Sequence, residues 1–363
     1  MPIKINRPVF LSAVVVVAGV GLIAVAGELN PPAGAVSPTM KDLDDVEPRN
    51  VIRNNEDGVT PIVISSPGSY KLGENIHAIG GEHGIEITSG RVSIDLNGFE
   101  ILGSEVGSLN GIFAENSVDD LTIRNGRIRF FTGAGISFVE SDRCRIEDVD
   151  VISTAAGGIV CGESAFIENC TANTVTIAFA VGISVGEDSK VFNCSADNCY
   201  TGFLAQTGSQ VTGCHATGST FAGFYVFGTA VPSGCVAIGT SQQTQYGIYQ
   251  EGFGLTSIAH NVITEFTTAG IRAEGSLQVH HNVINGSSFG GDTGMIFVGP
   301  RNFVFENSFL NCSVAAINFN NNCEQKVFAN RLANTGLLAI NNCSVLAPEE
   351  QAGVSTNPHA NLR

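Results

Sequence analysis

A small residue followed by an apolar one recurs through most of this chain, and its spacing constrains the fold more than any other feature. Between Gly111 and Gly336 the pair returns every 20 to 24 residues. Self-similarity at this period is typical of a solenoid, in which each repeat buries its apolar face against its neighbours. The pairs begin at Gly111, Gly135, Gly158, Gly182, Gly202, Gly223, Gly247, Gly270, Gly294, Ala316 and Gly336.

The residues within one repeat indicate strands rather than helices. In the segment 270–293, Ile271 and Ala273 alternate with Arg272 and Glu274, and further short apolar stretches follow between Gly, Ser and Asn turns. Alternation with a period of two is typical of strands, whereas a helical solenoid would need 3.6-residue stripes. We therefore predict an all-β parallel β-helix with three strands per coil and roughly eleven coils between residues 84 and 345.

The two ends of the chain differ from the repeats. Residues 2–7 are basic, residues 8–26 are almost entirely apolar, and Ala24-Val25-Ala26 has the small-x-small pattern of a secretory cleavage site. We predict a signal peptide at 1–26, an extended proline-rich and acidic leader at 27–61, the β-helix at 62–345 and a polar tail at 346–363. A membrane contact is expected only if the apolar segment stays uncleaved, and in either case the body lies outside the cytoplasm.

The charge balance restricts the partners. The chain has 18 Lys and Arg against 34 Asp and Glu, a net charge of −16, which disfavours nucleic acid. It also disfavours a polyanionic sugar unless a basic patch or bound calcium offsets the repulsion. The sequence otherwise requires no cofactor, and a glycan of the cell envelope or a free polysaccharide is the expected partner.

Alignment of the repeats predicts a column of stacked Asn and Cys side chains. Asn side chains in such a column can form an amide ladder, and thiols can pack there as small apolar groups. We expect the cysteines of this column to be unpaired, because directly stacked positions orient their Cβ atoms poorly for a disulfide. The column contains Asn97, Gly126, Val149, Cys170, Cys194, Cys214, Cys235, Asn261, Asn282, Asn307 and Asn330.

The start of the repeat region carries a family resemblance. After Ile62 the chain reads VISSPGSYKLGENI, and then GIEITSGRVSIDLNGFEILG with its Asp95-Leu96-Asn97-Gly98 turn. With the coils that follow, these segments resemble the secreted bacterial right-handed parallel β-helix proteins of the pectate-lyase-like superfamily. The resemblance implies a right-handed, single-stranded solenoid. It leaves the activity open, since the superfamily includes polysaccharide lyases, glycoside hydrolases, epimerases, tailspikes and adhesins.

The active-site motifs of the best-known enzymes in this superfamily are absent. The chain lacks the Asn-Thr-Asp, Gly-His-Gly and Arg-Ile-Lys set of polygalacturonases and the Asp-Pro-His-Glu motif of alginate epimerases. No specific enzyme family is therefore matched by these motifs, and any site has to be sought in the stacked columns.

Two outward columns, two residues apart on the strand that opens each coil, carry side chains suited to binding sugars. We expect Tyr225, Phe227, Tyr249 and Phe297 to provide aromatic faces for substrate, and Glu251, Glu274 and Arg272 to be the catalytic groups if there are any. Two stacked carboxylates would raise the pKa of one of them, as in a glycosidase general acid. The alternative is that a loop or a second subunit covers the aromatic rings and that Arg272 only neutralises the glutamates.

A run of arginines is expected to form a structural charge ladder. Arg124, Arg127 and Arg129 lie on one coil between two acidic coils. The alignment places Asp95 and Glu147 beside Arg124, Asp150 beside Arg127, and Glu100 beside Arg129.

A third column contains metal-binding residue types. His260, His281 and Glu306 fall on three consecutive coils, with His280 next to His281 in the chain. Two imidazoles and a carboxylate are a donor set for a divalent transition metal. A straight column, however, would not make the ligands converge on one ion, so the alternative is a set of stacked turn residues beside the Asn ladder.

Two functions remain open from the sequence. The first is a secreted or cell-surface protein that binds polysaccharide on the outer face of the stacked strands, and that would be a lyase or a glycoside hydrolase if it is an enzyme. The second is a non-enzymatic extracellular scaffold or adhesin. The absence of Trp in the chain weakens the first function, and the signal segment argues against a phage tailspike. The oligomeric state is open.

Overall fold

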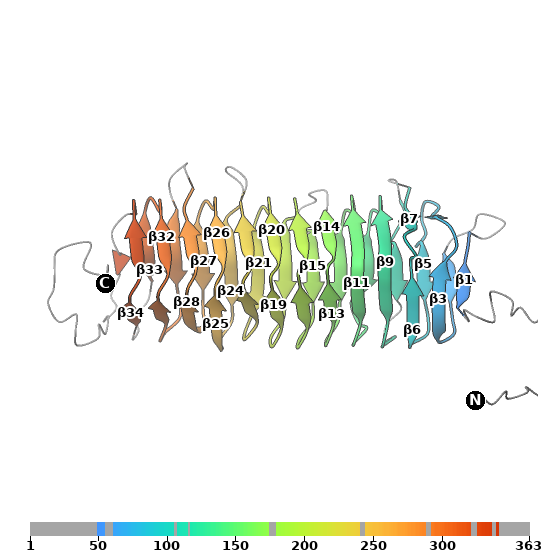
Figure 1. Ribbon diagram of the computed structural model, residues 1–363, viewed down its shortest axis with the longest axis horizontal. Coiled ribbons are helices and arrows are strands. Elements are labelled where there is room, and N and C mark those ends of the chain that lie inside the picture. Colours follow the sequence, from blue (N-terminus) through green and yellow to red (C-terminus); the bar gives the residue numbers. More distant parts are fainter. Residues whose placement is uncertain are drawn as a thin grey trace, which may run out of the picture. The chain divides into compact units, whose positions relative to one another are not determined.

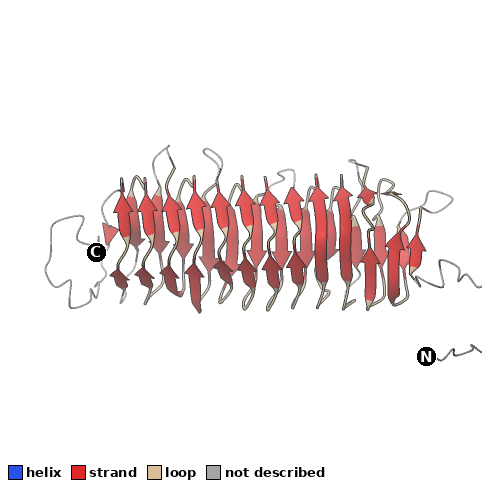
Figure 2. Cartoon of the chain, in the orientation of Figure 1, coloured by secondary structure: helices blue, strands red, loops and turns tan. Residues whose placement is uncertain are grey.

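The computed structural model describes residues 49–54, 61–104, 107–114, 117–173, 179–239, 244–287, 292–320, 325–335 and 339–340. Within these ranges the secondary structure is entirely β, and successive strands stack in register along the chain (Figures 1 and 2). All strand pairs are parallel, which requires each coil to return the chain to the start of the next one. The predicted parallel β-solenoid of about eleven coils is therefore confirmed.

The first strand of each coil belongs to a 13-stranded sheet. Its strands are β2 Ile62–Ile64, β5 Ile85–Ile87, β8 Ile112–Ala114, β10 Ala134–Phe138, β12 Gly157–Cys161, β15 Val181–Val185, β18 Thr201–Ala205, β21 Ala222–Phe227, β24 Tyr246–Glu251, β27 Ala269–Ala273, β30 Thr293–Phe297, β33 Ala315–Phe319 and β36 Ala339–Ile340.

The other strands of each coil belong to a 23-stranded sheet. In most coils these are two short strands separated by one tight turn, whereas β9 and β11 each run through that turn as a single long strand. The strands are β1 Asn50–Ile52, β3 Gly68–Leu72, β4 Ile76–His77, β6 Val92–Asp95, β7 Glu100–Leu102, β9 Thr122–Arg129, β11 Arg145–Ile152, β13 Phe166–Glu168, β14 Thr171–Asn173, β16 Lys190–Phe192, β17 Ser195–Asp197, β19 Gln210–Thr212, β20 His215–Thr217, β22 Val231–Ser233, β23 Val236–Ile238, β25 Leu255–Ala259, β26 Val262–Thr264, β28 Ser276–His280, β29 Val283–Asn285, β31 Phe303–Phe305, β32 Ser308–Leu310, β34 Lys326–Phe328 and β35 Arg331–Ala333.

The solenoid begins before its expected start at residue 62. Strand β1 pairs with β3, with Asn50 opposite Tyr70 and Ile52 opposite Leu72. Ile52 is buried in the same core as Leu72. The last part of the predicted leader is therefore the first strand of the stack, while the predicted signal peptide lies outside the described residues.

The repeated glycine is required by close contact between coils. A Cβ atom on Gly202 would lie 2.6 Å from the carbonyl oxygen of Gly223 and 2.9 Å from Cβ of Ala216 on the facing strand. A Cβ atom on Gly223 would in turn lie 2.9 Å from the carbonyl oxygen of Gly247. A larger side chain at these glycines would push the coils apart, and the one alanine at the repeated position is Ala316, near the end of the stack. The period that defines the sequence therefore marks the place where neighbouring coils approach most closely.

The Asn and Cys column is buried and continuous in the later coils. The backbone N–H of Asn261 donates to Oδ1 of Asn282 at 3.0 Å, and that of Asn282 donates to Oδ1 of Asn307 at 3.0 Å. In the Cys part of the column, the N–H of Cys170 donates to Sγ of Cys194 at 3.4 Å. The cysteines within the described ranges are free and buried, as expected. Cys323 and Cys343 lie outside the described residues.

The beginning of the predicted column is wrong at Asn97. Asn97 is exposed and has a left-handed backbone, with φ 54°. The position inside the coil is taken by Leu96, which lies under Gly126 of the next coil. The Asp95 carboxylate accepts the N–H of Asn97 and so stabilises the turn that places Leu96 inside.

Candidate functional site

The outer face of the 13-stranded sheet brings most of the predicted patch residues together. Tyr225 pairs with Tyr249, which pairs with Arg272 on the next strand. Phe227 pairs with Glu251 in the column two residues further along. These side chains are half-buried and alternate with buried neighbours, because successive residues of a strand point to opposite faces.

Tyrosine hydroxyls and an arginine hold the two glutamates. The hydroxyl of Tyr225 donates to Oε2 of Glu251, and that of Tyr249 donates to Oε1 of Glu274 at 3.2 Å. Nη2 of Arg272 forms an ion pair with the same Glu274 oxygen at 3.1 Å. The guanidinium of Arg272 also lies 5.0 Å from the ring centre of Tyr249, a cation–π contact. Arg272 therefore neutralises Glu274, as the alternative interpretation expected.

Further aromatic rings, not predicted from the sequence, extend this patch. Phe221 lies 5.5 Å from Tyr225 and 5.6 Å from both Tyr200 and Tyr246, measured between ring centres. Tyr200 and Phe221 stand two residues before the repeated glycine of their coils, which is the sequence signal that would have located them. Together with Tyr225, Phe227, Tyr249, Glu251, Arg272 and Glu274, these rings form what we call the aromatic patch.

Two tyrosines of the aromatic patch, Tyr225 and Tyr249, have a raised pKa and stay protonated far above neutral pH. Burial raises the pKa of Tyr249 to about 12, with the negative charge of Glu274 adding to the effect and Arg272 opposing it. Burial and the hydrogen bond to Glu251 likewise raise the pKa of Tyr225. Both hydroxyls are therefore hydrogen-bond donors, and the glutamates are their acceptors.

Phe297 does not belong to the aromatic patch, which corrects the expectation. It pairs with Ala273, not with Arg272, and its side chain is fully buried and stacks on Phe319 at 5.3 Å between ring centres. The residue opposite Arg272 is Ile296. Since neighbouring residues of a strand face opposite sides, a displacement of one residue in the alignment moves the ring from the surface to the core.

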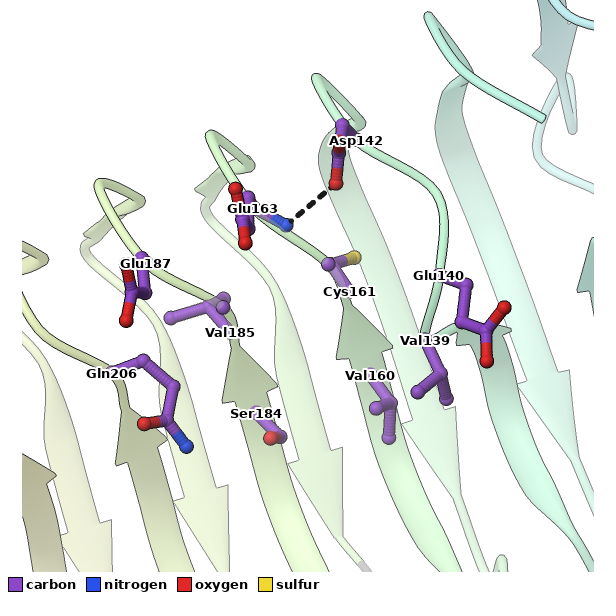
Figure 3. A pocket seen from close by; sticks show the side chains of 12 residues that line it. Val139, Glu140, Asp142, Val160, Cys161, Glu163, Ser184, Val185, Glu187 and Gln206 are labelled. Atoms are coloured by element: carbon purple, nitrogen blue, oxygen red, sulfur yellow. Dashed lines mark hydrogen bonds between the residues drawn. The ribbon is translucent and has the colours of Figure 1, made fainter. Parts of the chain in front are cut away.

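A groove lies on the same sheet, towards the N-terminal coils. It has a volume of about 440 Å³ and lies where β10, β12, β15 and β18 end. Val160 and Ser184 point out of adjacent strands beneath a row formed by Asp142, Glu163 and Glu187 on successive turns (Figure 3). The groove is therefore lined by both valine and serine along its strands and by carboxylates along one rim.

The groove and the aromatic patch lie in line with each other. Gln206 at the end of the groove directly follows Ala205, and Phe227 of the patch directly follows Val226. Ala205 and Val226 are paired on adjacent strands. Gln206 of the groove is therefore aligned with Phe227 on the next coil, and Phe227 with Glu251 on the coil after that.

The arginine run forms the expected charge ladder. Arg124 lies between Asp95 and Glu147 in the register, and its Nη2 is 3.2 Å from Oδ2 of Asp95. Glu100 pairs with Arg127 rather than with Arg129, a displacement of two residues from the predicted register. Its carboxylate nevertheless contacts both arginines, at 2.8 Å and 2.9 Å. These arginines are engaged with acidic neighbours, which is a structural role.

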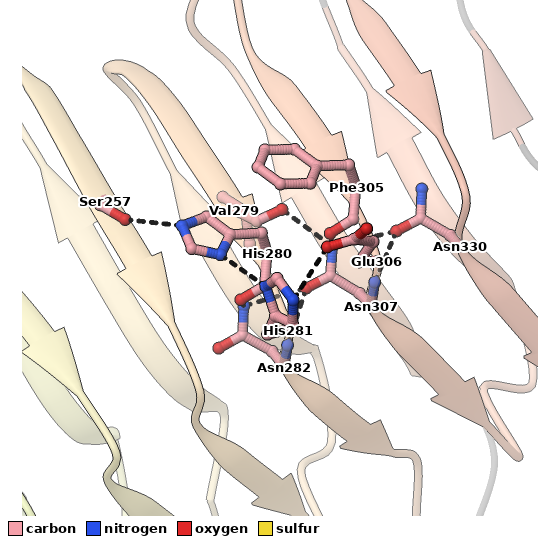
Figure 4. Close-up of polar contacts among 9 residues, drawn as sticks. All are labelled: Ser257, Val279, His280, His281, Asn282, Phe305, Glu306, Asn307 and Asn330. Atoms are coloured by element: carbon pink, nitrogen blue, oxygen red, sulfur yellow. Dashed lines mark hydrogen bonds and ion pairs between the residues drawn. The ribbon is translucent and has the colours of Figure 1, made fainter.

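The residues predicted as metal ligands lie together, and His280 rather than Glu306 completes the cluster of possible ligands with His260 and His281. Rings of His260 and His281 stack one coil apart at 4.9 Å, and Nε2 of His281 lies 2.8 Å from Oε2 of Glu306 (Figure 4). His280 brings its Nδ1 to 2.8 Å from Nδ1 of His281. Burial, together with His281 and His260, lowers the pKa of His280, so this imidazole is neutral at physiological pH. His260, His281 and Glu306 all have left-handed backbones, so each occupies the same kind of turn position on its coil.

No protein-family model matches this sequence, and no curated protein matches it. The described residues include no helix that is long and apolar enough to cross a membrane.

Solved structures with the same fold are found despite low identity. The periplasmic alginate epimerase AlgG has a TM-score of 0.56 at 11% identity, over 73% of this chain and 77% of its own. The catalytic domain of a GH87 α-1,3-glucanase, solved with tetrasaccharides, has a TM-score of 0.54 at 13% identity, over 87% and 69%. The A-module of the mannuronan C-5 epimerase AlgE4 from Azotobacter vinelandii has 0.51 at 14%, over 78% and 90%. This chain therefore shares the parallel β-helix fold of two alginate epimerases and an α-1,3-glucanase.

Proposed function

We propose that the protein binds a neutral polysaccharide along the outer face of the 13-stranded sheet. The observation that carries the proposal is the continuity of the groove beside β10 to β18 with the aromatic patch on β21, β24 and β27. A polymer that lies along the stack would contact the same type of position on each successive coil. Binding of an extended chain needs this kind of long surface rather than one deep pocket.

The chemistry of this surface suits sugar rings and hydroxyls. Aromatic faces stack on the apolar faces of sugars, and carboxylates accept hydrogen bonds from sugar hydroxyls. Beyond the rings of the aromatic patch, Phe253 stands two residues after Glu251 and is 87% exposed. An aromatic side chain with this exposure is available to a ligand at the rim of the patch.

Charge favours a neutral polymer over a uronate polymer. Glu140, Asp142, Glu163 and Glu187 line the groove, and no Lys or Arg is among its lining residues. A polyuronate at this place would meet like charges unless calcium bridged them. Calcium is thus the cofactor hypothesis that remains to be tested, and binding of a uronate polymer that depends on added Ca²⁺ would support it.

Three solved structures with this fold are named for enzymes that act on polysaccharides, which supports a glycan ligand by analogy of fold. The Asp-Pro-His-Glu motif of alginate epimerases is absent from this chain. Glu251 and Glu274 are the pair to test for glycoside hydrolysis or lyase chemistry, with Arg272 beside them. An extracytoplasmic location, either secreted or on the cell surface, is part of the proposal and rests on the N-terminal sequence.

The test is affinity electrophoresis of the protein with a panel of neutral and uronate polysaccharides. Removing the ring in Tyr249→Ala should weaken binding about tenfold, the effect of losing one well-packed aromatic contact together with its hydrogen bond. Tyr70→Ala on the other sheet is the matched control and should bind like the unchanged protein. Glu251→Gln should also weaken binding, with Glu168→Gln as its control.

Catalysis is tested in the same panel by following reducing ends, unsaturated products and changes in sugar configuration. Turnover that disappears in Glu251→Gln but persists in Glu168→Gln would make the protein an enzyme. Failure to bind any polysaccharide, together with unchanged behaviour of Tyr249→Ala, would overturn the proposal. That outcome would favour the second function, a non-enzymatic extracellular scaffold, for which the outward Ser137 and Ser184 of the earlier coils are the supporting feature.

A further inference from the structure

We propose that His260, His280 and His281 bind a divalent transition-metal ion, with zinc as the ion to test, at an open site on the 23-stranded sheet. The site lies at the turns between β25 and β26 and between β28 and β29. It is separate from the aromatic patch, and the proposal does not depend on glycan binding.

The three imidazoles converge because they come from two columns. His260 and His281 are stacked turn residues on neighbouring coils, and two stacked ligands alone would lie on a line. His280 ends strand β28, in the next column, and its ring is nearly perpendicular to both of the others, at 83° and 86°. One ligand nitrogen from each residue lies within 4.8 Å of the other two. The three nitrogens can therefore approach one ion, which ligands in a single straight column could not do.

In two of these rings, His280 and His281, the Nε2 atom already contacts a polar side chain. Nε2 of His281 lies 2.8 Å from Oε2 of Glu306, and Nε2 of His280 lies 3.2 Å from Oγ of Ser257. Phe305 stacks on His280 at 4.8 Å with an angle of 12° between the rings. Metal-binding histidines in proteins typically have this arrangement, in which the other ring nitrogen donates to a carboxylate or a hydroxyl. The Nδ1 atoms of His280 and His281 then face each other (Figure 4).

Metal binding requires the rings of His280 and His281 to separate slightly and the nitrogen of His260, which lies within 4.8 Å of theirs, to approach by up to about 1.5 Å. The two Nδ1 atoms are 2.8 Å apart and share one proton in a hydrogen bond. In a tetrahedral site with Zn–N bonds of about 2.0–2.1 Å, two ligand nitrogens are roughly 3.3 Å apart, so the rings need to separate by about half an ångström. The shared proton can move to Nε2 of His280, where it is donated to Ser257, so that both Nδ1 lone pairs point to the metal ion.

The donor set identifies the class of ion. Three imidazole nitrogens suit zinc, copper and nickel better than calcium or magnesium, which prefer oxygen ligands. His260 and His281 are exposed, so a fourth position is open to water. Glu306 was predicted as a ligand, but it instead orients His281 through Nε2, the nitrogen that points away from His280.

The experiment is titration of the purified full chain with ZnCl₂ in a calorimeter, with Co²⁺ absorption as a second measurement. We expect one ion per chain and the intense visible bands of tetrahedral nitrogen-coordinated cobalt. His280→Ala should reduce the affinity by more than about 100-fold, and Glu306→Gln by about 10- to 100-fold, as for other residues that orient a ligand. His281→Asn removes a ligand while tolerating the left-handed backbone at this turn. His215→Ala, at a lone exposed histidine on β20, is the matched control and should bind normally.

Circular dichroism and a thermal melt of each variant in the absence of metal establish that the solenoid is intact. If folded His280→Ala and folded His281→Asn bind zinc as tightly as the His215→Ala control, the proposal is wrong. It is equally wrong if the unchanged protein binds no zinc or shows the pale spectrum of octahedral cobalt.

Discussion

Replacement of Asn282 by alanine should destabilise the solenoid severely, since Asn282 lies in the middle of the buried amide ladder. Its Oδ1 accepts the backbone N–H and the Nδ2 of Asn261, both at 3.0 Å. Its Nδ2 donates to the carbonyls of Ile258 and His280, at 2.9 Å and 3.0 Å, and to Oδ1 of Asn307 at 3.0 Å. The alanine variant loses all of these hydrogen bonds and leaves the N–H of Asn261 buried without its partner.

The magnitude follows from these contacts. A hydrogen bond contributes about 0.5–1.5 kcal/mol net, and a buried group left without a partner costs about 1–3 kcal/mol. Because losses within one network are not additive, we expect the free energy of unfolding to fall by roughly 4 kcal/mol in Asn282→Ala. Asn285→Ala, on the same coil, is the matched control. It removes one surface hydrogen bond, in which Nδ2 of Asn311 donates to Oδ1 of Asn285 at 2.8 Å, and should lower the free energy of unfolding by less than about 1 kcal/mol.

Cysteine at the same position should be tolerated much better than alanine. In the earlier coils the Sγ of Cys235 donates to the carbonyls of Val211 and Ser233, at 3.3 Å and 3.5 Å. These correspond to the carbonyls of Ile258 and His280, which Asn282 contacts. A thiol has one S–H, which it can share between these two carbonyls, so it replaces part of the amide hydrogen bonding. The loss of unfolding free energy in Asn282→Cys should therefore be smaller than in Asn282→Ala, at about half its size.

The assay is urea unfolding followed by circular dichroism, with hydrogen exchange of the Asn261 amide as the local measurement. A solenoid can unfold in parts, so the first transition is the one to compare. Asn282→Ala should lower its midpoint and remove protection at Asn261, and Asn282→Cys should keep part of both. Equal effects of Asn282→Ala and Asn285→Ala, or of alanine and cysteine at position 282, would refute this account of the ladder.

Two further predictions concern the coil contacts and the aromatic patch. Gly202→Ala should lower the free energy of unfolding by about 1–3 kcal/mol, because the new Cβ forces the coils apart. Gly157→Ala should lower it less, because its new Cβ would lie no closer than 3.2 Å to a neighbour. Equal urea midpoints of the two variants would contradict this prediction. The folded pKa of Tyr249, about 12, is above the unfolded value of 10, so its contribution to stability is complete below pH 10 and is lost as pH rises through 12. Tyrosinate absorbance measures the pKa, and thermal melts at alkaline pH measure the loss of stability. In Tyr249→Phe the stability should fall less steeply between pH 10 and 12.

Much of the site was predictable because the columns of a solenoid follow from its period. Tyr225, Tyr249 and Arg272 are paired on adjacent strands as the repeats indicated, and the arginine ladder meets Asp95 and Glu147 as expected. The predictions failed where the count was displaced by one or two residues, at Asn97, at Phe297 and at Glu100. Turns of different length absorb the variation in coil length, so the number of residues between two columns does not by itself define which residue faces which.

The sequence alone determined the stacking of short parallel strands, because a glycine can recur at this period only where each coil meets the next in the same way. It also determined the buried Asn and Cys column and the acidic character of the surface. Only the tertiary structure decided that the groove runs in line with the aromatic patch and that His280 turns towards His281. Both depend on how side chains from different columns are oriented at the turns. The spacing of residues along the sequence predicts which residues share a column but not the direction in which their side chains point.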